Sequence, residues 1–512
     1  MIYSSIAARI EERLPVSVQR QKNQIEHQVA TTWGWMTLHI RSKRPFLLRW
    51  GVPLLIILAA IGMGRMVVIM GQRGLNPYFL IAPLFIPFAL IALSFIITRF
   101  EWSAVMILFA AIFIPIKIPT GTASTIVDSL LIAFIFTGNW IFKMLLVDRR
   151  ITLRPSPINV PFFGFAIITF ISMFWSLLYI DPLVHVKGNF IIVQAGAAIV
   201  NVMLPITLFL VSNHIDDMKQ LHIMVILVLI GGALAWVTRF GGVKLPAPLG
   251  INDDGMFTMW VAVLGFSMAM YNKGLNWKSR IVCLIVGIML QFSRFLINLS
   301  WLAGWLPGII ALAVLVFRRS KLLVFLVVIG AVLFIFVNLD TMQAALEEES
   351  TKSGDTRQFA WQVNWRITGK HLLFGTGQAA YLNYYESYFG DLWVEATHNT
   401  IMDILAQNGF FGLFFVFWYC IALILYNYKL CLRLEGRNDF AEALANACFA
   451  GTVSSVITMA FGDWLFPFAY TQTIAGYDYI VYSWIFMGVG LAVDRLVREE
   501  EISVQNLQEL SL

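Results

Sequence analysis

Residues 221–238 read LHIMVILVLIGGALAWVT, a run of eighteen residues without a Lys, Arg, Asp or Glu. A helix needs about 20 mostly apolar residues to cross the ~30 Å hydrocarbon core of a bilayer. Arg239 follows the run at once, at the point where such a helix would leave the membrane. This stretch therefore predicts a membrane-spanning helix.

Thirteen further stretches have the same character, although those at 102–116 and 281–293 are short. Of the 512 residues, 59% are hydrophobic and 13% are charged, whereas soluble domains carry about 25% charged residues. This composition excludes a disordered chain except at the ends. The expected fold is all-α, a polytopic membrane protein with about 14 transmembrane helices and one long outer loop. The expected spans are 50–71, 77–98, 102–116, 125–146, 158–178, 190–211, 221–238, 255–271, 281–293, 296–317, 322–338, 400–426, 439–460 and 476–494.

Positive charge is distributed unevenly between the predicted loops. With a cytoplasmic N-terminus, the inner segments hold 24 Lys and Arg residues and the outer segments hold 10. Because cytoplasmic loops are enriched in Lys and Arg, both termini are expected in the cytoplasm. The formal net charge of +6 then follows largely from topology, and no nucleic-acid partner is expected. None of the four cysteines lies in an outer segment, so no disulfide framework is implied.

The hydropathy pattern divides the chain into five parts. Residues 1–49 form a basic cytoplasmic tail, 50–338 a transmembrane bundle, 339–399 a long outer loop, 400–494 the C-terminal transmembrane helices and 495–512 a cytoplasmic tail. No cleavable signal peptide is expected, and the first span serves as the insertion signal. Within the N-terminal tail, Ile6–Leu14 fits a surface-lying amphipathic helix as well as it fits a disordered basic segment.

The loop at 339–399 is far longer than the other outer segments and has a net charge of −4. Its middle, Gln358–Leu373, places Trp361, Trp365 and apolar residues at helical spacing, which predicts one or two amphipathic helices on the outer face. A loop of this length is usually functional or disordered, and its aromatic content favours a folded loop. Gly375-Thr376-Gly377 is interpreted as a turn, since no strand precedes it and no lysine follows.

Four outward groups are unexpected under the positive-inside rule: Arg239, Arg294, Arg357 and His398. An arginine between two apolar spans needs a nearby anion, and guanidinium groups bind phosphate in a bidentate manner. Converging arginines would suit a lipid diphosphate whose tail lies in the bilayer. Ordinary explanations stay open: Arg294 snorkelling to headgroups, Arg239 solvated in a loop, and His398 as a helix-capping or interfacial side chain.

Other polar residues carry less information. Asp403 lies about one turn inside the span that follows His398. It either orients the imidazole or, as the more common arrangement, faces water at the mouth of the span. Asp253-Asp254 is interpreted as a helix start, because acids favour the first turn. No His/Cys metal spacing and no Ser-His-Asp pattern stands out, so no metal site is expected.

The stretch 398–413, HNTIMDILAQNGFFGL, resembles the signature of the O-antigen ligase and O-antigen polymerase superfamily. In that family a His-Asn pair opens a helix, and a Leu-Ala-x-x-Gly-x-x-Gly-Leu turn interrupts it. Segments 357–361 and 373–377, Ser293-Arg294, and Arg239 with its Gly/Pro stretch and Asn252 resemble further motifs of the family. The resemblance covers roughly residues 230–425. Phe295-Leu-Ile departs from the small residues that often follow the Ser-Arg motif, which puts the packing at Arg294 in doubt.

The resemblance implies a bacterial inner-membrane glycosyltransferase of the GT-C type, which acts at the periplasmic face on an undecaprenyl-diphosphate-linked glycan. It implies no metal and no nucleotide sugar, so no cofactor is expected. Arg294 and Arg239 would bind the diphosphate, with Arg357 as a third candidate and Asn399 as a further substrate-binding residue. His398 would take the proton of the acceptor hydroxyl, with inversion at the anomeric carbon. Candidate sugar platforms, equally explained as interface anchors, are Trp361, Trp365 and Tyr384 or Tyr385.

The expected reaction is that of a polymerase, which transfers the glycan to a sugar hydroxyl of another lipid-linked glycan of an O-antigen or exopolysaccharide. An O-antigen ligase, which transfers the glycan to lipid A core, is the alternative within the family. A polysaccharide transporter or flippase and a scaffold of an export complex are alternatives of other classes. The expected partners are the lipid-linked donor, the glycan acceptor, membrane lipids, and a chain-length regulator or export complex.

Overall fold

The structure, a computed structural model, describes residues 99–120, 124–243, 250, 251, 256–297, 301–322, 325, 329, 336–339, 343, 355–390, 397–467, 472 and 474–511. Contacts within the chain divide it into Met1–Phe95 and Ile96–Leu512, and the described residues belong to the second unit. The predicted tail at 1–49 and the spans at 50–71 and 77–98 lie outside the described residues. So do most of the 322–338 span and parts of the 339–399 loop.

Helices make up most of the described chain. Nine of the described helices are long and apolar enough to cross a membrane, and two further apolar helices are shorter. Eleven predicted spans coincide with described helices, including the weak one at 281–293, which extends over Trp277–Ile297. A total of about 14 spans stays a prediction. The elements are η2 Phe100–Trp102, α5 Ser103–Phe113, α6 Asp128–Phe142 with the π-helical turn η3 Lys143–Val147, α7 Asn159–Leu178, α8 Phe190–His214, α9 Met218–Phe240, α10 Phe257–Tyr271, α11 Trp277–Ile297, α12 Leu302–Arg319, α15 Asp355–Thr368, α16 Tyr381–Phe389, α17 Thr400–Arg433, α18 Phe440–Thr458, η5 Ile474–Gly476 and α19 Tyr477–Ser511.

A small sheet departs from the all-α expectation. The strand β1 (Lys117–Pro119) pairs antiparallel with β2 (Thr125–Val127), with Ile118 opposite Ile126. Proline at 119 does not fit a helix interior, and the β-branched residues of β2 suit a strand. The resulting two-stranded sheet lies between α5 and α6 in the chain, and Val127 of β2 is buried in the main hydrophobic core.

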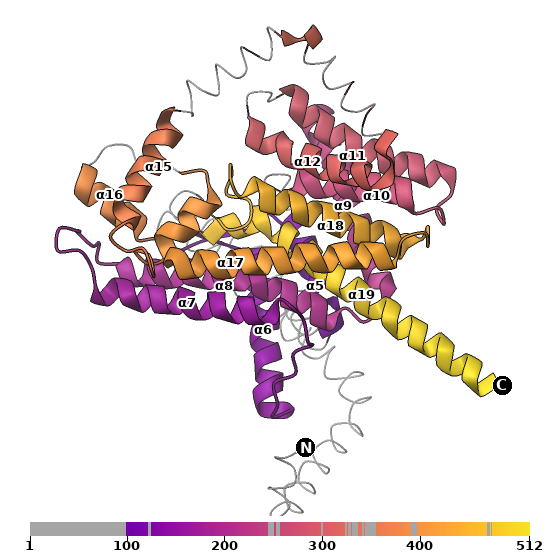
Figure 1. The fold of residues 1–512 in the computed structure, drawn as a ribbon, viewed down its shortest axis with the longest axis horizontal. Helices are drawn as coiled ribbons and strands as arrows, with labels where there is room; N and C mark the ends of the chain where they lie inside the picture. The colour runs from indigo at the N-terminus through magenta and orange to yellow at the C-terminus, as the bar shows by residue number, and fades with distance from the viewer. Residues whose placement is uncertain are drawn as a thin grey trace, which may run out of the picture. The chain divides into compact units, whose positions relative to one another are not determined.

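The centre of the bundle is formed by helices that are buried on nearly all sides. α10 packs against α11 and α18, and α19 packs against α8 and α18 (Figure 1). Small residues of α18 permit this close approach: a Cβ added at Gly451 would lie 2.3 Å from the ring of Trp260. Small residues are typical of helix contacts in membranes, because helices there associate through close packing rather than through the hydrophobic effect. Outer positions such as Phe134, Phe170 and Phe174 are exposed and suit contact with lipid.

Helix α17 is interrupted at Gly409, the first glycine of the motif that predicted an interruption. Its backbone angles, φ 67° and ψ −166°, lie in a region that essentially only glycine occupies. The N–H groups of Phe410 and Phe411 donate outside the helix, to the carbonyls of Leu372 (2.7 Å) and Leu373 (3.3 Å). The interruption that the sequence predicted is therefore confirmed.

The segment 371–377 fills this break. The N–H groups of Thr376 and Gly377 donate to the carbonyls of Ala406 (2.7 Å) and Gln407 (3.2 Å). Gly375 and Gly377 have φ values of +72° and +98°, which confirms the turn predicted there. Non-helical backbone inside a membrane span must find partners within the protein, and this segment supplies them. α15 and α16, which flank the segment, are thereby fixed to the first part of α17.

The helix ends gather in two groups because neighbouring helices run in opposite directions. We call one group the His398 end: α17 begins there and α18 ends there, joined by the N–H of Thr400 and the carbonyl of Met459 (2.9 Å). At the opposite group, the Arg495 end, the N–H of Lys273 donates to the carbonyl of Asn438 (2.8 Å). α15 packs on α17 near the His398 end (Figure 1) and confirms the helix predicted in the long loop.

Candidate functional site

His398 lies immediately before α17 in a conformation that few non-glycine residues adopt, with φ 44°. Its neighbour Thr397 is held by α15, because Trp361 Nε1–H donates to the Thr397 carbonyl at 2.8 Å. Strained backbone of this kind persists where the surroundings over-determine it, often at functional sites. The imidazole is 47% exposed and can meet a ligand from outside the bundle.

Asn399 uses its side chain inside the protein. Its Oδ1 accepts hydrogen bonds from the N–H groups of Ile401 (3.0 Å) and Met402 (3.2 Å), which caps the helix. Its Nδ2 donates to the carbonyl of Ala460 at 2.9 Å. The side-chain amide of Asn399 therefore caps α17 with its oxygen and joins the start of α17 to the loop after α18 with its nitrogen.

The same loop provides a partner for the histidine that the sequence did not indicate. Asp463 Oδ2 lies 3.5 Å from His398 Nδ1, and the Asp463 side chain is 5% exposed. Thr400 Oγ1–H donates to the Gly462 carbonyl at 2.8 Å and holds the loop in place. A carboxylate beside Nδ1 favours the tautomer that carries the proton there, which leaves Nε2 free to accept a proton.

A second carboxylate, Asp403, stands behind this pair. It is 5% exposed, and Thr397 Oγ1–H donates to its Oδ1 at 2.8 Å. The expected water-facing position of Asp403 is therefore wrong, because Thr397 and the helices packed on α17 cover it. Asp403 and Asp463 interact electrostatically, so the two acids belong to one buried polar cluster beside the start of α17.

The two arginines of the predicted diphosphate site lie on neighbouring helix ends. Arg294 lies in the last turn of α11 and is 6% exposed, which argues against snorkelling to headgroups. The preceding residue, Ser293, accepts a hydrogen bond from Trp236 Nε1–H of α9 at 3.0 Å. Arg239 follows Trp236 within one turn of α9 and is exposed. One of these guanidinium groups is thus embedded in protein and the other is open to solvent.

An aromatic contact connects the start of α12 to the loop that carries Asp463. Trp301, at the start of α12, lies 6.4 Å from the ring of Trp464, the residue after Asp463. Arg357 precedes Trp361 by four residues on α15, a spacing that puts both on one helix face. The structure therefore brings Trp361 and Asp463 to the segment of His398. Arg239 and Arg294 lie in the last turns of α9 and α11, and Arg357 lies on α15, which packs on α17.

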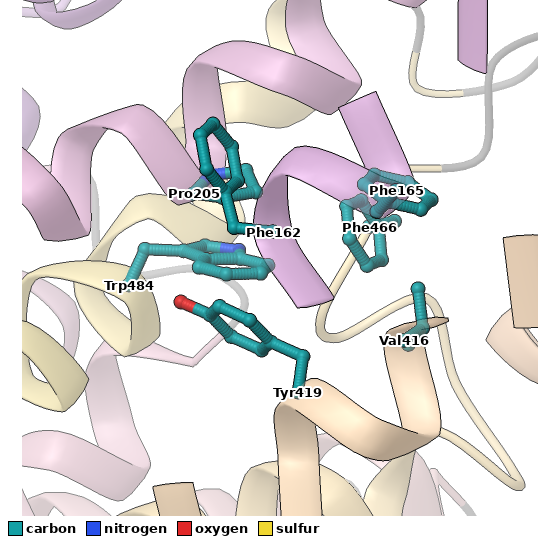
Figure 2. Close-up of a pocket in the computed structure, with 7 residues that line it drawn as sticks. All are labelled: Phe162, Phe165, Pro205, Val416, Tyr419, Phe466 and Trp484. Carbon is teal, nitrogen blue, oxygen red and sulfur yellow. The ribbon is translucent and has the colours of Figure 1, made fainter. Parts of the chain in front are cut away.

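An apolar pocket lies under the loop that carries Asp463. Trp484 Nε1–H donates to the Leu465 carbonyl at 2.8 Å, and the ring of Phe466 lies 5.3 Å from that of Trp484. Figure 2 shows the rings of Tyr419 and Trp484 facing each other across this pocket. The pocket has room for about one water molecule, so it supports the loop by packing. It is lined by Phe162, Phe165, Pro205, Val416, Tyr419, Phe466 and Trp484.

The aromatic residues of the long loop divide into buried and exposed ones. Tyr384 and Tyr385 are each 1% exposed and belong to a hydrophobic cluster with Phe190 and Val363. The expectation that either of them stacks on a sugar is therefore wrong, because their rings are covered by protein. Trp365 is 51% exposed and stays available for such a contact.

The α15–α16 region is also bound to the turn between α7 and α8. The Tyr388 hydroxyl donates to Asp181, and Lys370 Nζ lies 3.5 Å from the same carboxylate. The bond from Tyr388 holds the pKa of Asp181 below its ordinary value, and Lys370 contributes in the same direction.

Among the residues that the structure describes, no group of three His, Cys, Asp or Glu side chains could hold a metal ion.

Comparison with known proteins gives one match to part of the chain. Residues 279–417 match the protein family described as O-Antigen ligase. The matched stretch runs from α11 into α17 and contains Arg294, Arg357, His398 and Asn399, whereas Arg239 and Asp463 lie outside it. A search of curated proteins found no match.

Proposed function

We propose that this chain, which carries the domain of the O-antigen ligase and polymerase superfamily at residues 279–417, transfers a glycan from a lipid diphosphate to a hydroxyl group. The family match and the nine long apolar helices among the described residues make it a multi-pass membrane protein of the ligase or polymerase type. The observation that carries the proposal is the contact of His398 with buried Asp463 at 3.5 Å.

His398 is the general base in this proposal. The Asp463 carboxylate keeps the imidazole proton of His398 on Nδ1. Nε2 then accepts the proton of the acceptor hydroxyl as the hydroxyl oxygen attacks the anomeric carbon. The imidazolium that forms is stabilised by the carboxylate of Asp463. General base catalysis of this kind contributes about 10²–10⁴-fold to the rate.

The arginines act on the leaving group. Negative charge develops on the phosphate oxygen that departs, and cations fixed in advance near that oxygen stabilise the transition state. Arg294 is buried and presents a bidentate donor, while Arg239 and Arg357 approach the diphosphate from α9 and α15. Asn399 is assigned to positioning His398, because its amide groups are engaged within the protein. Attack from the face opposite the leaving group inverts the anomeric centre.

The His398 end is proposed to face the periplasm, with an undecaprenyl-diphosphate-linked glycan as donor. Lys and Arg residues concentrate at the Arg495 end, as cytoplasmic ends of membrane helices do. The proposed orientation includes a cytoplasmic N-terminus, and it places the long segment that carries α15 and α16 on the periplasmic side.

The test is transfer by the purified full-length protein in nanodiscs, with a synthetic lipid-diphosphate glycan as donor. His398→Gln should lower kcat by at least about 100-fold, while the control His185→Gln, an exposed histidine outside the site, should act as wild type. Asp463→Asn should lower kcat and alter its pH profile, and Arg294→Lys should lose the bidentate contact and transfer more slowly. A wild-type rate for His398→Gln would remove the histidine from the chemistry.

The acceptor distinguishes polymerase from ligase. We favour a polymerase, in which the product is a ladder of longer glycans on the carrier lipid. The description of the matched family, O-Antigen ligase, favours the second candidate, for which the product is a glycan on lipid A core. Offering both acceptors in one reaction and separating the products by gel decides between them, and transport without any transfer would favour a flippase.

A further inference from the structure

A pocket at the Arg495 end lies away from His398 and has no part in the proposed transfer. It is formed where the α10–α11 turn, the end of α12 and the α17–α18 turn meet, and it has a volume of about 260 Å³. The backbone bond from Lys273 to Asn438 joins two of these turns at 2.8 Å. The side chains that determine its charge are Lys273, Arg318, Arg319, Glu435 and Glu442.

The acids of the pocket do not neutralise its cations. Glu442 is 4% exposed and accepts the N–H of Asn438 at 2.5 Å, so its carboxylate is engaged within the protein. Glu435 lies 3.8 Å from Arg318 and is 67% exposed, and such solvated pairs contribute little. Within the described part of the chain, neither Lys273 nor Arg319 forms an ion pair. The acids of the pocket therefore leave Lys273 and Arg319 available for an anion, and they pair only weakly with Arg318.

Aromatic rings hold the arginines in place. The Arg318 guanidinium lies 5.7 Å from the ring of Tyr428 and 5.9 Å from that of Phe449, and its side chain is 13% exposed. Its Nε–H donates to Asn446 Oδ1 at 2.9 Å, which leaves the N–H groups at its tip for another acceptor. A guanidinium fixed in this way loses little freedom when it binds an anion.

Arg319 is held in a similar way on the other wall. Its guanidinium lies 5.6 Å from the ring of Tyr271, and the Tyr271 hydroxyl donates to the Leu315 carbonyl at 3.0 Å. The apolar side chains next to the arginines, Phe317 and Leu322, are 68% and 67% exposed. The pocket thus borders a surface suited to lipid, at the ends of apolar helices that are long enough to span a membrane.

We propose that this pocket binds the phosphate headgroup of an anionic phospholipid. Basic pockets between helices at a membrane surface attract such headgroups, and each Lys or Arg near the surface adds to the attraction. The two arginines supply planar donors that match phosphate oxygens, and Lys273 adds a third cation at the rim. The bound lipid joins α10, α12 and the α17–α18 turn, and so stabilises this end of the bundle.

The experiment measures the melting temperature of the purified full-length protein in neutral detergent as lipid is added. Phosphatidylglycerol should raise the melting temperature and phosphatidylcholine should not. In the double variant Lys273→Gln/Arg319→Gln, the apparent affinity for phosphatidylglycerol should fall by roughly 30-fold. The control Lys219→Gln/Lys429→Gln removes two exposed cations at the same end outside the pocket and should behave as wild type.

Further measurements distinguish binding of the whole lipid from binding of a phosphate group alone. Inorganic phosphate and glycerol 3-phosphate, added without lipid, should stabilise the protein only weakly. Stabilisation by inorganic phosphate equal to that by phosphatidylglycerol would assign the pocket to free phosphate and overturn the lipid proposal. Phosphatidylglycerol could stabilise the Lys273/Arg319 double variant as much as the wild type, or the control could lose as much apparent affinity as the double variant. Either result would show that the lipid does not bind in this pocket. Both variants keep His398 and its surroundings, so transfer activity reports on the proposed function separately.

Discussion

The break in α17 is tested most directly by the substitution Gly409→Ala. At φ 67° and ψ −166°, an alanine is strained by about 1–3 kcal/mol. The added Cβ would also lie 2.4 Å from the carbonyl carbon and oxygen of Leu373, closer than atoms in contact approach. The backbone at Gly409 cannot move without disturbing the hydrogen bonds that the N–H groups of Phe410 and Phe411 donate to the carbonyls of residues 372 and 373.

The two costs can be separated within the same chain. Gly390, which ends α16, has nearly the same backbone angles, φ 76° and ψ −169°, but an added Cβ there meets no atom within 4 Å. Gly390→Ala therefore measures strain alone, about 1–3 kcal/mol. Gly409→Ala adds the loss of two buried hydrogen bonds, each about 0.5–1.5 kcal/mol, for a total of about 2–6 kcal/mol. Gly138→Ala, in the open interior of helix α6, should be neutral or slightly stabilising.

The assay is thermal unfolding of the three purified variants in detergent, followed by tryptophan fluorescence, with glycan transfer measured in parallel. The melting temperature should fall most for Gly409→Ala, less for Gly390→Ala and not at all for Gly138→Ala. Transfer should be lost for Gly409→Ala even below its melting temperature, since the break fixes the segment that carries His398. Equal melting temperatures for Gly409→Ala and Gly390→Ala would show that the contact with residues 372–373 is not as described.

Three further outcomes are expected. Burial lowers the pKa of His371 from its ordinary value of 6.5, so the unfolded chain binds the proton more readily and stability falls as the pH drops below about 6.5. His371→Gln should reduce this loss when melting temperatures are measured between pH 7.5 and 5.5. An unchanged dependence of the melting temperature on pH would contradict this expectation. Trp361→Phe keeps an aromatic ring but removes the N–H that donates to Thr397. This change should cost about 1 kcal/mol of stability and lower kcat more than it changes KM. An unaltered kcat in steady-state kinetics would count against a role of Trp361 in orienting His398. Transfer should persist in EDTA, because arginines supply the positive charge, and activity that EDTA removes and Mg²⁺ restores would refute this.

Hydropathy was sufficient to predict the helices because each span is a local property of the chain. The run at 221–238 lies within α9, and the short candidate at 281–293 lies within α11. The small sheet after α5 was missed, since a strand of three residues leaves no periodic signal. The helix end at 297 was also not predicted: Arg294 lies inside α11 rather than between two spans, because Phe295, Leu296 and Ile297 continue the helix without a breaking residue.

The candidate site was only partly predictable for a related reason. His398 and Gly409 occur in one local motif, and their backbone conformations agree with that motif. Asp463 lies 65 residues after His398, and only the packing of the α18–α19 loop on the start of α17 brings the two together. The sequence MAFGDW at 459–464 does contain a signal, an acid in an apolar stretch between two spans, where an unpaired charge is costly. Such an acid predicts a buried partner but does not identify it.

These contacts assign different roles to the two parts of α17. The part before Gly409 is bonded to segment 371–377 on one side and to the 459–463 loop on the other, whereas the part after Gly409 packs along α7 and α18. A force on α15 is therefore passed to His398 directly, through Trp361 and Thr397, without bending a continuous helix. A glycan that contacts the exposed ring of Trp365 on α15 would in this way bear on the position of the imidazole.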